Sequence, residues 1–134
     1  LEAKTQAAGL NSRVHFLGWR AEAARLMAGL DILLAPSLWE GFGLVLLEAM
    51  AQQTAIIASR VSAIPEVVVD RETGILVAPQ DVDGLAEAMS ELLRDSALRQ
   101  HMGLMGRDRL ETAFNATRMV DETIALYHTV IDGM

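Results

Sequence analysis

Two glutamates, Glu40 and Glu48, stand at the ends of the run EGFGLVLLE, with seven residues between them. Glycines flank Phe42 in the first half of this run, and glycine lets the backbone pass close to a ligand. A helix predicted to begin near Gly43 would add unpaired N–H groups and a positive dipole end, which suit a phosphate or a sugar oxygen. This arrangement favours a site for a ligand that carries both an anion and hydroxyl groups.

The position of Glu48 on the predicted helix 43–53 leaves two interpretations. It shares a helix face with Leu44, Leu47 and Ala51, so a helical wheel points it toward buried surface, where a carboxylate needs hydrogen-bond donors. The hydroxyls of a ribose or a hexose would supply such donors without a counter-charge. Alternatively, the helix exposes a narrow polar edge and water solvates the carboxylate.

Segments of two periodicities alternate along the chain on both sides of this run. Continuous or short apolar runs predict strands at 13–17, 31–35, 55–59 and within 72–79. Helical spacing predicts helices at 20–30, 43–53, 81–94, 96–114 and 117–131, with a short helical turn in 64–70. Because strands and helices alternate, we predict an α/β fold: a doubly wound, parallel, Rossmann-like sheet of about four strands with C-terminal helices.

Ligands of such a sheet bind beyond the carboxyl ends of the strands, at the loops that lead into helices. The loops after Leu17, after Ala35 and after Ser59 are therefore the candidate binding loops, and the second one contains Glu40. Arg60 follows the third of these strands and could reach a phosphate, although a loop arginine is usually solvated.

The composition excludes several classes of protein. A chain of 134 residues with 51% hydrophobic residues predicts one domain with a real core. The absence of cysteine excludes disulfides and thiolate ligands, and the net charge of -7 argues against nucleic acid as a partner. No apolar run approaches the roughly 20 residues that span a bilayer, and the N-terminus lacks the features of a signal peptide. We therefore expect no transmembrane segment and a cytoplasmic location.

Two further patterns have simple structural explanations. The sequence DVD resembles a metal-binding D-x-D pattern, but an N-cap at Asp81 with Asp83 in the first helical turn explains it. His15, inside a predicted strand, is interpreted as a core or edge residue rather than a catalyst. We predict no metal site in the chain.

Three stretches together resemble the C-terminal, donor-binding domain of the GT-B retaining glycosyltransferases of family 4, the group 1 glycosyl transferases: VHFLGW, DILLAPSLWEGFGLVLLEAMA and AIIASRVSAIPEVVVDRETGILVAPQDVDGLAEAM. The similarity runs in register over residues 13–89, and the E-x7-E element from Glu40 to Glu48 is its most specific part. It implies the donor-binding part of an enzyme that transfers a sugar from a nucleoside-diphosphate sugar to a glycan, lipid or small-molecule acceptor. It also implies retention of the anomeric configuration, and no metal or other cofactor.

The resemblance implies a role for individual residues as well. Glu40 would contact hydroxyls of the donor sugar, and the backbone of Gly41, Phe42 and Gly43 would lie against the sugar and the diphosphate. Glu48 would bind the ribose hydroxyls of the nucleotide. Further nucleotide contacts are implied at Gly18, Trp19, Arg20 and Leu44. No catalytic residue is assigned within the chain.

Parts of such an enzyme lie outside residues 1–134 if the resemblance holds. An acceptor-binding N-terminal domain, two further strands, and the Arg and Lys that clamp the diphosphate would all precede residue 1. We therefore expect a partial domain that is catalytically silent alone, in a protein that the absent domain could hold peripherally at the inner membrane. The missing strands would leave an open edge, so we expect either pairing of 13–17 with 31–35 or edge-mediated self-association.

The chain departs from the family pattern at positions that often carry glycine, among them Gln53, Ser62 and Arg71. Two other functions remain open. One is a non-catalytic module that binds a nucleotide or a nucleotide sugar. The other is a related GT-B enzyme, such as a sugar epimerase or a phosphorylase, and the E-x7-E spacing speaks against it.

Overall fold

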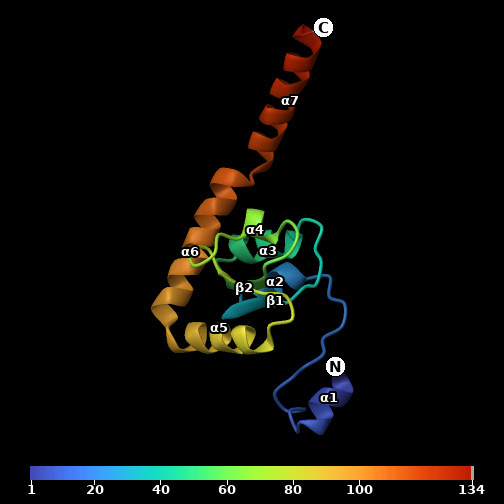
Figure 1. Ribbon diagram of the computed structural model, residues 1–134, viewed down its shortest axis with the longest axis vertical. Coiled ribbons are helices and arrows are strands. Elements are labelled where there is room, and N and C mark those ends of the chain that lie inside the picture. The colour runs from blue at the N-terminus through green and yellow to red at the C-terminus, as the bar shows by residue number, and fades with distance from the viewer. Residues whose placement is uncertain (134) are drawn as a thin grey trace.

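The computed structural model describes residues 1–133 and has a parallel sheet at its centre (Figure 1). The sheet has three strands in the order β1–β2–β3, namely Ile32–Ala35, Ala55–Ser59 and Ile75–Val77. Leu33 of β1 lies opposite Ile56 of β2, and Ala58 of β2 lies opposite Leu76 of β3. Since all pairings are parallel, the carboxyl ends of the strands meet at one edge of the sheet.

Helices cover both faces of this sheet. In chain order the helices of residues 1–133 are α1 (Glu2–Ala7), α2 (Ala23–Met27), α3 (Leu44–Ala51), α4 (Ile64–Val67), α5 (Val82–Arg94), α6 (Ser96–Ala113) and α7 (Ala116–Asp132), of which α1 and α7 do not cover the sheet. Figure 1 shows α3 and α4 above the sheet and α5 below it, while α7 extends away from the body and α1 lies apart at the other end. None of these helices within residues 1–133 is both long and apolar enough to cross a membrane.

Two apolar clusters, one on each face, hold the helices to the sheet. Alternate residues of a strand point to opposite faces, so Ile56 packs in one cluster and Ile57 in the other. The first cluster contains Met27, Leu46, Ala49, Met50, Ile56, Ala58, Ile64, Val67, Val68 and Leu76. The second contains Ala55, Ile57, Ile75, Val77, Ala88, Leu92 and Met102. Every residue of β2 is buried, which explains why its sequence is apolar without alternation.

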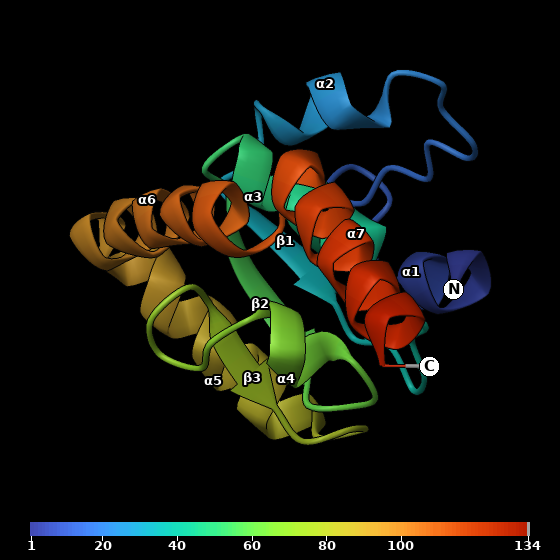
Figure 2. The same cartoon turned by 90° about the horizontal axis from the view of Figure 1, so that it is seen from above.

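Helix α6 joins the two faces of the domain. Met102 belongs to the second cluster, whereas Leu110 packs against the first. Between them, Gly103 lies so close to the turn after α3 that a Cβ at this position would be 2.0 Å from the backbone oxygen of Gln53. The view from above in Figure 2 shows α6 beside α3 and β2.

The structure confirms the predicted α/β class, the parallel sheet and the helical C-terminal part. The limits predicted for α5, α6 and α7 agree with the structure to within one residue. The predicted N-cap at Asp81 is also confirmed, because its Oδ1 accepts a hydrogen bond of 2.8 Å from the Gly84 amide.

The predicted strand at 13–17 is wrong, and so is its pairing with β1. This segment has no strand structure, and its apolar side chains Val14, Phe16 and Leu17 are exposed. An isolated run of five residues gains no stability as a strand without a neighbour that satisfies its backbone groups. Within the described chain the sheet therefore has three strands, and β1 is an edge strand. The predicted helix 20–30 is also shorter, since α2 covers Ala23–Met27.

Three positions at which the family pattern often carries glycine adopt the left-handed backbone conformation. The φ angle is 56° at Gln53, 47° at Ser62 and 67° at Arg71. This region is sterically unfavourable for residues with a Cβ and is the region that glycine occupies without penalty. The chain therefore carries local backbone strain at these turns.

We expect Gln53→Gly to raise the free energy of unfolding by about 0.5–1 kcal/mol, because it removes the left-handed strain and costs only the extra entropy of glycine in the unfolded chain. The adjacent Gln52 is a matched control, since its φ is -96° and glycine there offers no relief. Urea unfolding of both variants measures the effect. A loss of stability in Gln53→Gly as large as that in Gln52→Gly would contradict the explanation.

Candidate functional site

The loop 36–43 connects the carboxyl end of β1 to the start of α3. Gly43 is the N-cap of α3 and has a left-handed φ of 81°. A Cβ here would lie 2.9 Å from Cδ1 of Leu46, so both the conformation and the space favour glycine. No side chain caps the first turn of α3. The Leu46 amide donates a hydrogen bond of 2.8 Å to the Gly43 carbonyl oxygen, whereas the amides of Leu44 and Val45 have no hydrogen-bond partner within residues 1–133 and are available to an external acceptor.

Glu40 lies in this loop and is half-buried. Its Oε1 accepts a hydrogen bond of 3.1 Å from the Gly41 amide, which holds the carboxylate beside the loop backbone. The Glu40 amide in turn faces the Ser62 hydroxyl oxygen at 3.5 Å. Because Ser62 follows β2, the structure brings the predicted loops after β1 and after β2 together. The contact between Ser62 and Glu40 was not predicted, because the sequence showed only that Ser62 follows a buried strand.

Glu48 is exposed on α3, so of the two interpretations left open by the sequence the structure agrees with the exposed polar edge and not with the buried face. The buried residues of this helix are Leu46, Ala49 and Met50, which pack on the sheet. Helix α3 is apolar on nearly every side, and a helical wheel therefore could not identify the face that meets the sheet. The exposed carboxylate stands on the helix that begins at the Glu40 loop.

The predicted nucleotide-binding residues Gly18, Trp19 and Arg20 lie in an exposed segment before α2. Trp19 is 88% exposed. Within residues 1–133, no hydrogen bond joins this segment to the loop 36–43. The structure therefore places the loop–helix residues, with Leu44 at the start of α3, apart from the segment 18–20, and the binding roles of both groups stay predictions.

Arg60, the candidate phosphate ligand after β2, forms an ion pair with Asp70. Its Nη2 lies 2.5 Å from Oδ2 of Asp70, while Oδ1 of Asp70 accepts a hydrogen bond of 2.8 Å from the Leu76 amide. Burial raises the pKa of Asp70, but the Leu76 amide and Arg60 outweigh it, so the pKa lies below the ordinary value of 3.8. This pair ties the end of β2 to the turn before β3.

The Asp70 carboxylate should make stability depend on pH. A carboxyl group whose pKa is lower in the folded than in the unfolded chain stabilises the fold above its ordinary pKa, and this stabilisation is lost as the pH falls through the lowered pKa. Urea unfolding should show wild type more stable than Asp70→Asn at about pH 6, with the difference shrinking below about pH 4. A difference that stays constant down to about pH 3 would contradict the lowered pKa.

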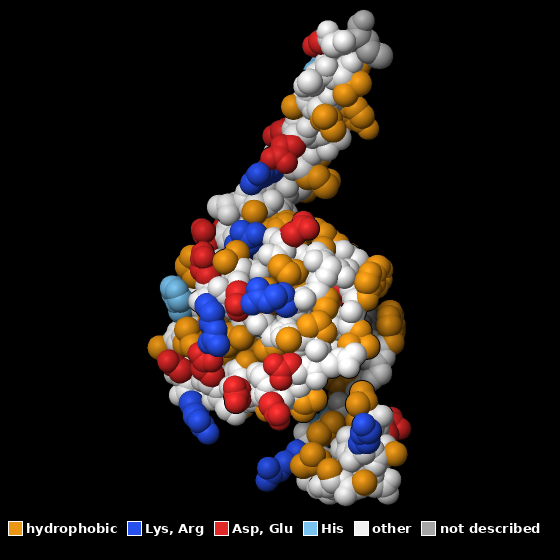
Figure 3. All heavy atoms as spheres, viewed as in Figure 1, with side chains coloured by type: hydrophobic (Ala, Val, Ile, Leu, Met, Phe, Trp, Pro, Cys, Tyr) orange, Lys and Arg blue, Asp and Glu red, His pale blue; other side chains and the backbone are white. Residues whose placement is uncertain are grey.

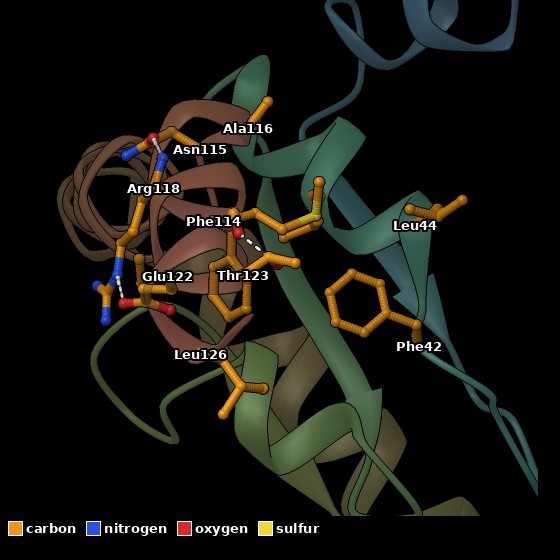
Figure 4. Close-up of a pocket in the computed structure, with 12 residues that line it drawn as sticks. Phe42, Leu44, Phe114, Asn115, Ala116, Arg118, Glu122, Thr123 and Leu126 are labelled. Atoms are coloured by element: carbon orange, nitrogen blue, oxygen red, sulfur yellow. Dashed lines mark hydrogen bonds and ion pairs between the residues drawn. The ribbon is translucent and has the colours of Figure 1, made fainter. Parts of the chain in front are cut away.

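An apolar groove of about 640 Å³ opens next to the loop 36–43. Phe42, Leu44 and Leu47 line one wall, and the residues that line the other are Ala113, Phe114, Asn115, Ala116, Arg118, Met119, Glu122, Thr123 and Leu126. Figure 4 shows the rings of Phe42 and Phe114 facing each other across it. Their centroids are 6.1 Å apart and their planes meet at 67°, an edge-to-face arrangement.

No group of three or more His, Asp or Glu side chains among the described residues is placed to hold a metal ion. What the arrangement offers instead is a carboxylate in a glycine-rich loop, an uncapped helix end and a second, exposed carboxylate on the same helix. These groups suit a ligand that carries both hydroxyl groups and an anionic group.

A family model described as "Glycosyl transferases group 1" matches residues 1–95. The chain belongs to the group 1 glycosyl transferases. This group 1 chain is 38% identical over 122 residues to N-acetyl-alpha-D-glucosaminyl L-malate synthase of Bacillus anthracis, covering 91% of the chain and 32% of that relative. It is 40% identical over 111 residues to an MMP alpha-(1->4)-mannosyltransferase of Mycolicibacterium hassiacum, covering 82% and 27%. It thus spans about a third or less of these curated relatives.

Solved structures of related proteins share the fold of this group 1 chain. Sucrose-phosphate synthase from Thermosynechococcus elongatus superposes with a TM-score of 0.89 at 35% identity, over 99% of this chain and 34% of that one. The C-terminal domain of a Francisella tularensis group 1 family protein gives 0.79 at 38% identity, over 86% and 60%. Anabaena HepE, solved in complex with UDP, gives 0.86 at 26% identity, over 92% and 35%. These similarities confirm the predicted fold, the C-terminal domain of a GT-B glycosyltransferase.

Proposed function

We propose that this chain is the donor-binding part of a retaining glycosyltransferase that transfers a sugar from a nucleoside-diphosphate sugar to an acceptor. The acceptor, a glycan, a lipid or a small molecule, would be held by an N-terminal domain of the same protein. Membership of the group 1 family and the likeness to a protein solved with UDP support this proposal. A cytoplasmic location belongs to the same proposal.

The observation that carries the proposal is the junction between β1 and α3. Its left-handed Gly43 opens the first turn of α3, where no side chain occupies the N–H groups. Glu40 lies immediately before these groups in the same loop. A diphosphate at the helix end and sugar hydroxyls at Glu40 would therefore be served by adjacent residues.

Each group has a distinct part in the proposed reaction. Glu40 accepts hydrogen bonds from hydroxyls of the donor sugar and orients the anomeric carbon. The Gly41 amide holds the Glu40 carboxylate, while the backbone amides at residues 42–44 and the dipole of α3 stabilise the negative charge that grows on the departing nucleoside diphosphate. Glu48 accepts hydrogen bonds from the ribose hydroxyls, and the segment 18–20 borders the nucleobase. We propose that no metal ion or other cofactor takes part.

A transfer assay on the full-length protein tests the proposal. Nucleoside-diphosphate sugars with different bases are supplied with an acceptor extract, and released nucleoside diphosphate is measured with and without a chelator. We expect release with one donor class, unaffected by the chelator, and a loss of about ten- to hundredfold in kcat/KM for Glu40→Ala, because hydrogen bonds to a charged group contribute about 1.5–3 kcal/mol.

The same assay also tests whether the anomeric configuration is retained and whether the protein is an enzyme at all. An α-linked donor should give an α-linked product if the reaction retains configuration, which the anomeric proton coupling in the NMR spectrum reports. Binding of a nucleotide sugar without any release of nucleoside diphosphate would contradict the enzyme and favour the alternative, a non-catalytic nucleotide-sugar binding module.

A further inference from the structure

Arg109 on α6 is fixed at the C-terminal end of α4. Its Nε donates a hydrogen bond of 2.8 Å to the carbonyl oxygen of Val67, and its Nη2 donates one of 2.7 Å to that of Glu66. Carbonyl groups at the end of a helix lack intrahelical partners and carry partial negative charge. Two hydrogen bonds from one planar guanidinium therefore lock the position of this side chain relative to α4.

The same guanidinium also holds an aromatic ring. Its Cζ lies 5.5 Å from the ring centroid of Phe114, within the range of a cation–π interaction. Phe114 is the C-cap of α6, is half-buried and packs against the first apolar cluster. Its ring is thus held from one side by Arg109 and from beneath by the core.

The other neighbour of this ring is Phe42, in the middle of the loop 36–43. The two rings meet edge to face with centroids 6.1 Å apart (Figure 4). Phe42 is 46% exposed and has Gly41 and Gly43 on either side, so the backbone around it has few steric restraints of its own. Contact with a ring that is itself fixed therefore limits where this loop can lie.

A second connection from the loop leads to the same place. The Glu40 amide faces the Ser62 hydroxyl at 3.5 Å, beyond the usual N–H···O range, and Ser62 lies just before α4. Arg109 holds the other end of α4. A weak polar contact and an aromatic contact thus connect the middle of the loop 36–43 to α4 and to Phe114, and Arg109 contacts both of these.

We infer that Arg109 and Phe114 are positioning residues, which act through Phe42 to hold the backbone of residues 41–43 in place for the donor sugar and diphosphate. This inference rests on the proposed function. It assigns a role to residues at the end of α6 that lie far in sequence from the Glu40 loop. Phe42 acts in this arrangement through its side chain, while its backbone faces the ligand.

Kinetics of the full-length protein test the inference through variants that remove one ring. An aromatic pair contributes about 0.5–1.5 kcal/mol, so Phe114→Leu and Phe42→Leu should each lower kcat/KM for the donor about two- to tenfold. The double variant should lose little more than either single variant, because the same contact is already gone. The affinity for the free nucleoside, which the loop does not touch in this arrangement, should change less than about twofold.

Leu98→Ala is the matched control. Leu98 is a half-buried residue of α6 that packs against the second cluster, on the opposite face of the sheet. The Leu98→Ala substitution should lower the unfolding temperature without a selective loss of kcat/KM for the donor. The inference is overturned if Phe114→Leu behaves as Leu98→Ala does, or if the losses of Phe42→Leu and Phe114→Leu simply add. Should Phe114→Leu fail to fold, the exposed Phe42→Leu and Arg109→Lys carry the comparison.

A second readout separates this inference from the proposed function. In the ¹⁵N-labelled full-length protein, the order parameters of the Gly41, Phe42 and Gly43 amides should fall from about 0.85 to below about 0.6 in Phe114→Leu and stay unchanged in Leu98→Ala. If the protein transfers no sugar but its order parameters fall in this way, the proposed function is contradicted and the positioning of the loop by Phe114 is supported. Unchanged order parameters in an active enzyme would overturn the inference alone.

Discussion

Glu48→Ala in the full-length protein is expected to weaken binding of a nucleoside diphosphate by about ten- to hundredfold. Hydrogen bonds to a charged group contribute about 1.5–3 kcal/mol, and each 1.4 kcal/mol changes affinity about tenfold. The carboxylate is exposed on α3 in the structure, so a ligand would reach it without movement of any part of the core. Isothermal titration with uridine, guanosine and adenosine diphosphates measures the loss for whichever base binds.

Two companion variants sharpen this titration. Glu87→Ala removes another exposed glutamate from α5, on the other side of the sheet, and should leave the affinity unchanged. Glu48→Gln keeps the size of the side chain and one acceptor oxygen, so its affinity should fall between those of wild type and Glu48→Ala. Equal affinity in wild type and Glu48→Ala would show that Glu48 does not bind the ribose.

Gly103→Ala should cause the largest loss of stability among the single-methyl substitutions of the chain's helices. The added Cβ would lie 2.0 Å from the backbone oxygen of Gln53 and 2.7 Å from its carbonyl carbon. Both atoms belong to the backbone, so α6 must move away from the turn between α3 and β2. Overpacking that shifts backbone costs about 1–3 kcal/mol or more, which we expect as a lower free energy of unfolding in urea.

Two other glycines of the chain provide a graded comparison. A Cβ at Gly106 would meet the flexible side chain of Met50 at 3.2 Å, and one at Gly29 would meet nothing closer than 3.6 Å. We therefore expect Gly106→Ala to cost less than Gly103→Ala, and Gly29→Ala to cost least. If Gly103→Ala is as stable as Gly29→Ala, α6 does not pack on this turn as the structure shows.

The sequence predicted those elements whose stability comes from local pattern. The apolar run of β2 has every residue buried, and Asp81 marks the start of α5 because its side chain caps that helix. Such features depend on residues close in the chain. The parallel sheet, the helices on its two faces and the helical C-terminal part were therefore all predictable.

What the sequence could not predict depends on partners that are distant in the chain. The run 13–17 has strand-like composition, but a strand also needs a neighbour, and β1 pairs with β2 alone in the described sheet. The sequence left the face of Glu48 undecided because α3 is apolar almost all round, and only packing selects the side that Leu46 and Met50 share.

The residues of the candidate site also fall into those that nearby sequence reveals and those that only distant contacts reveal. Glu40 and Gly43 could be identified from their spacing within one short run. Arg109 and Phe114 could not, because an arginine and a phenylalanine near a helix end carry no pattern that points to a loop about seventy residues earlier. Their part in the site became visible only through the contacts of their side chains with α4 and Phe42.

A crystal structure of the full-length protein with a nucleoside diphosphate tests most directly whether the β1–α3 junction binds the donor. We expect the ribose hydroxyl oxygens within about 3 Å of the Glu48 carboxylate, and phosphate oxygens at a similar distance from the amides at the start of α3. The space beside Glu40 should remain open for the sugar. A nucleotide bound elsewhere, or a ribose that faces away from Glu48, would contradict the account.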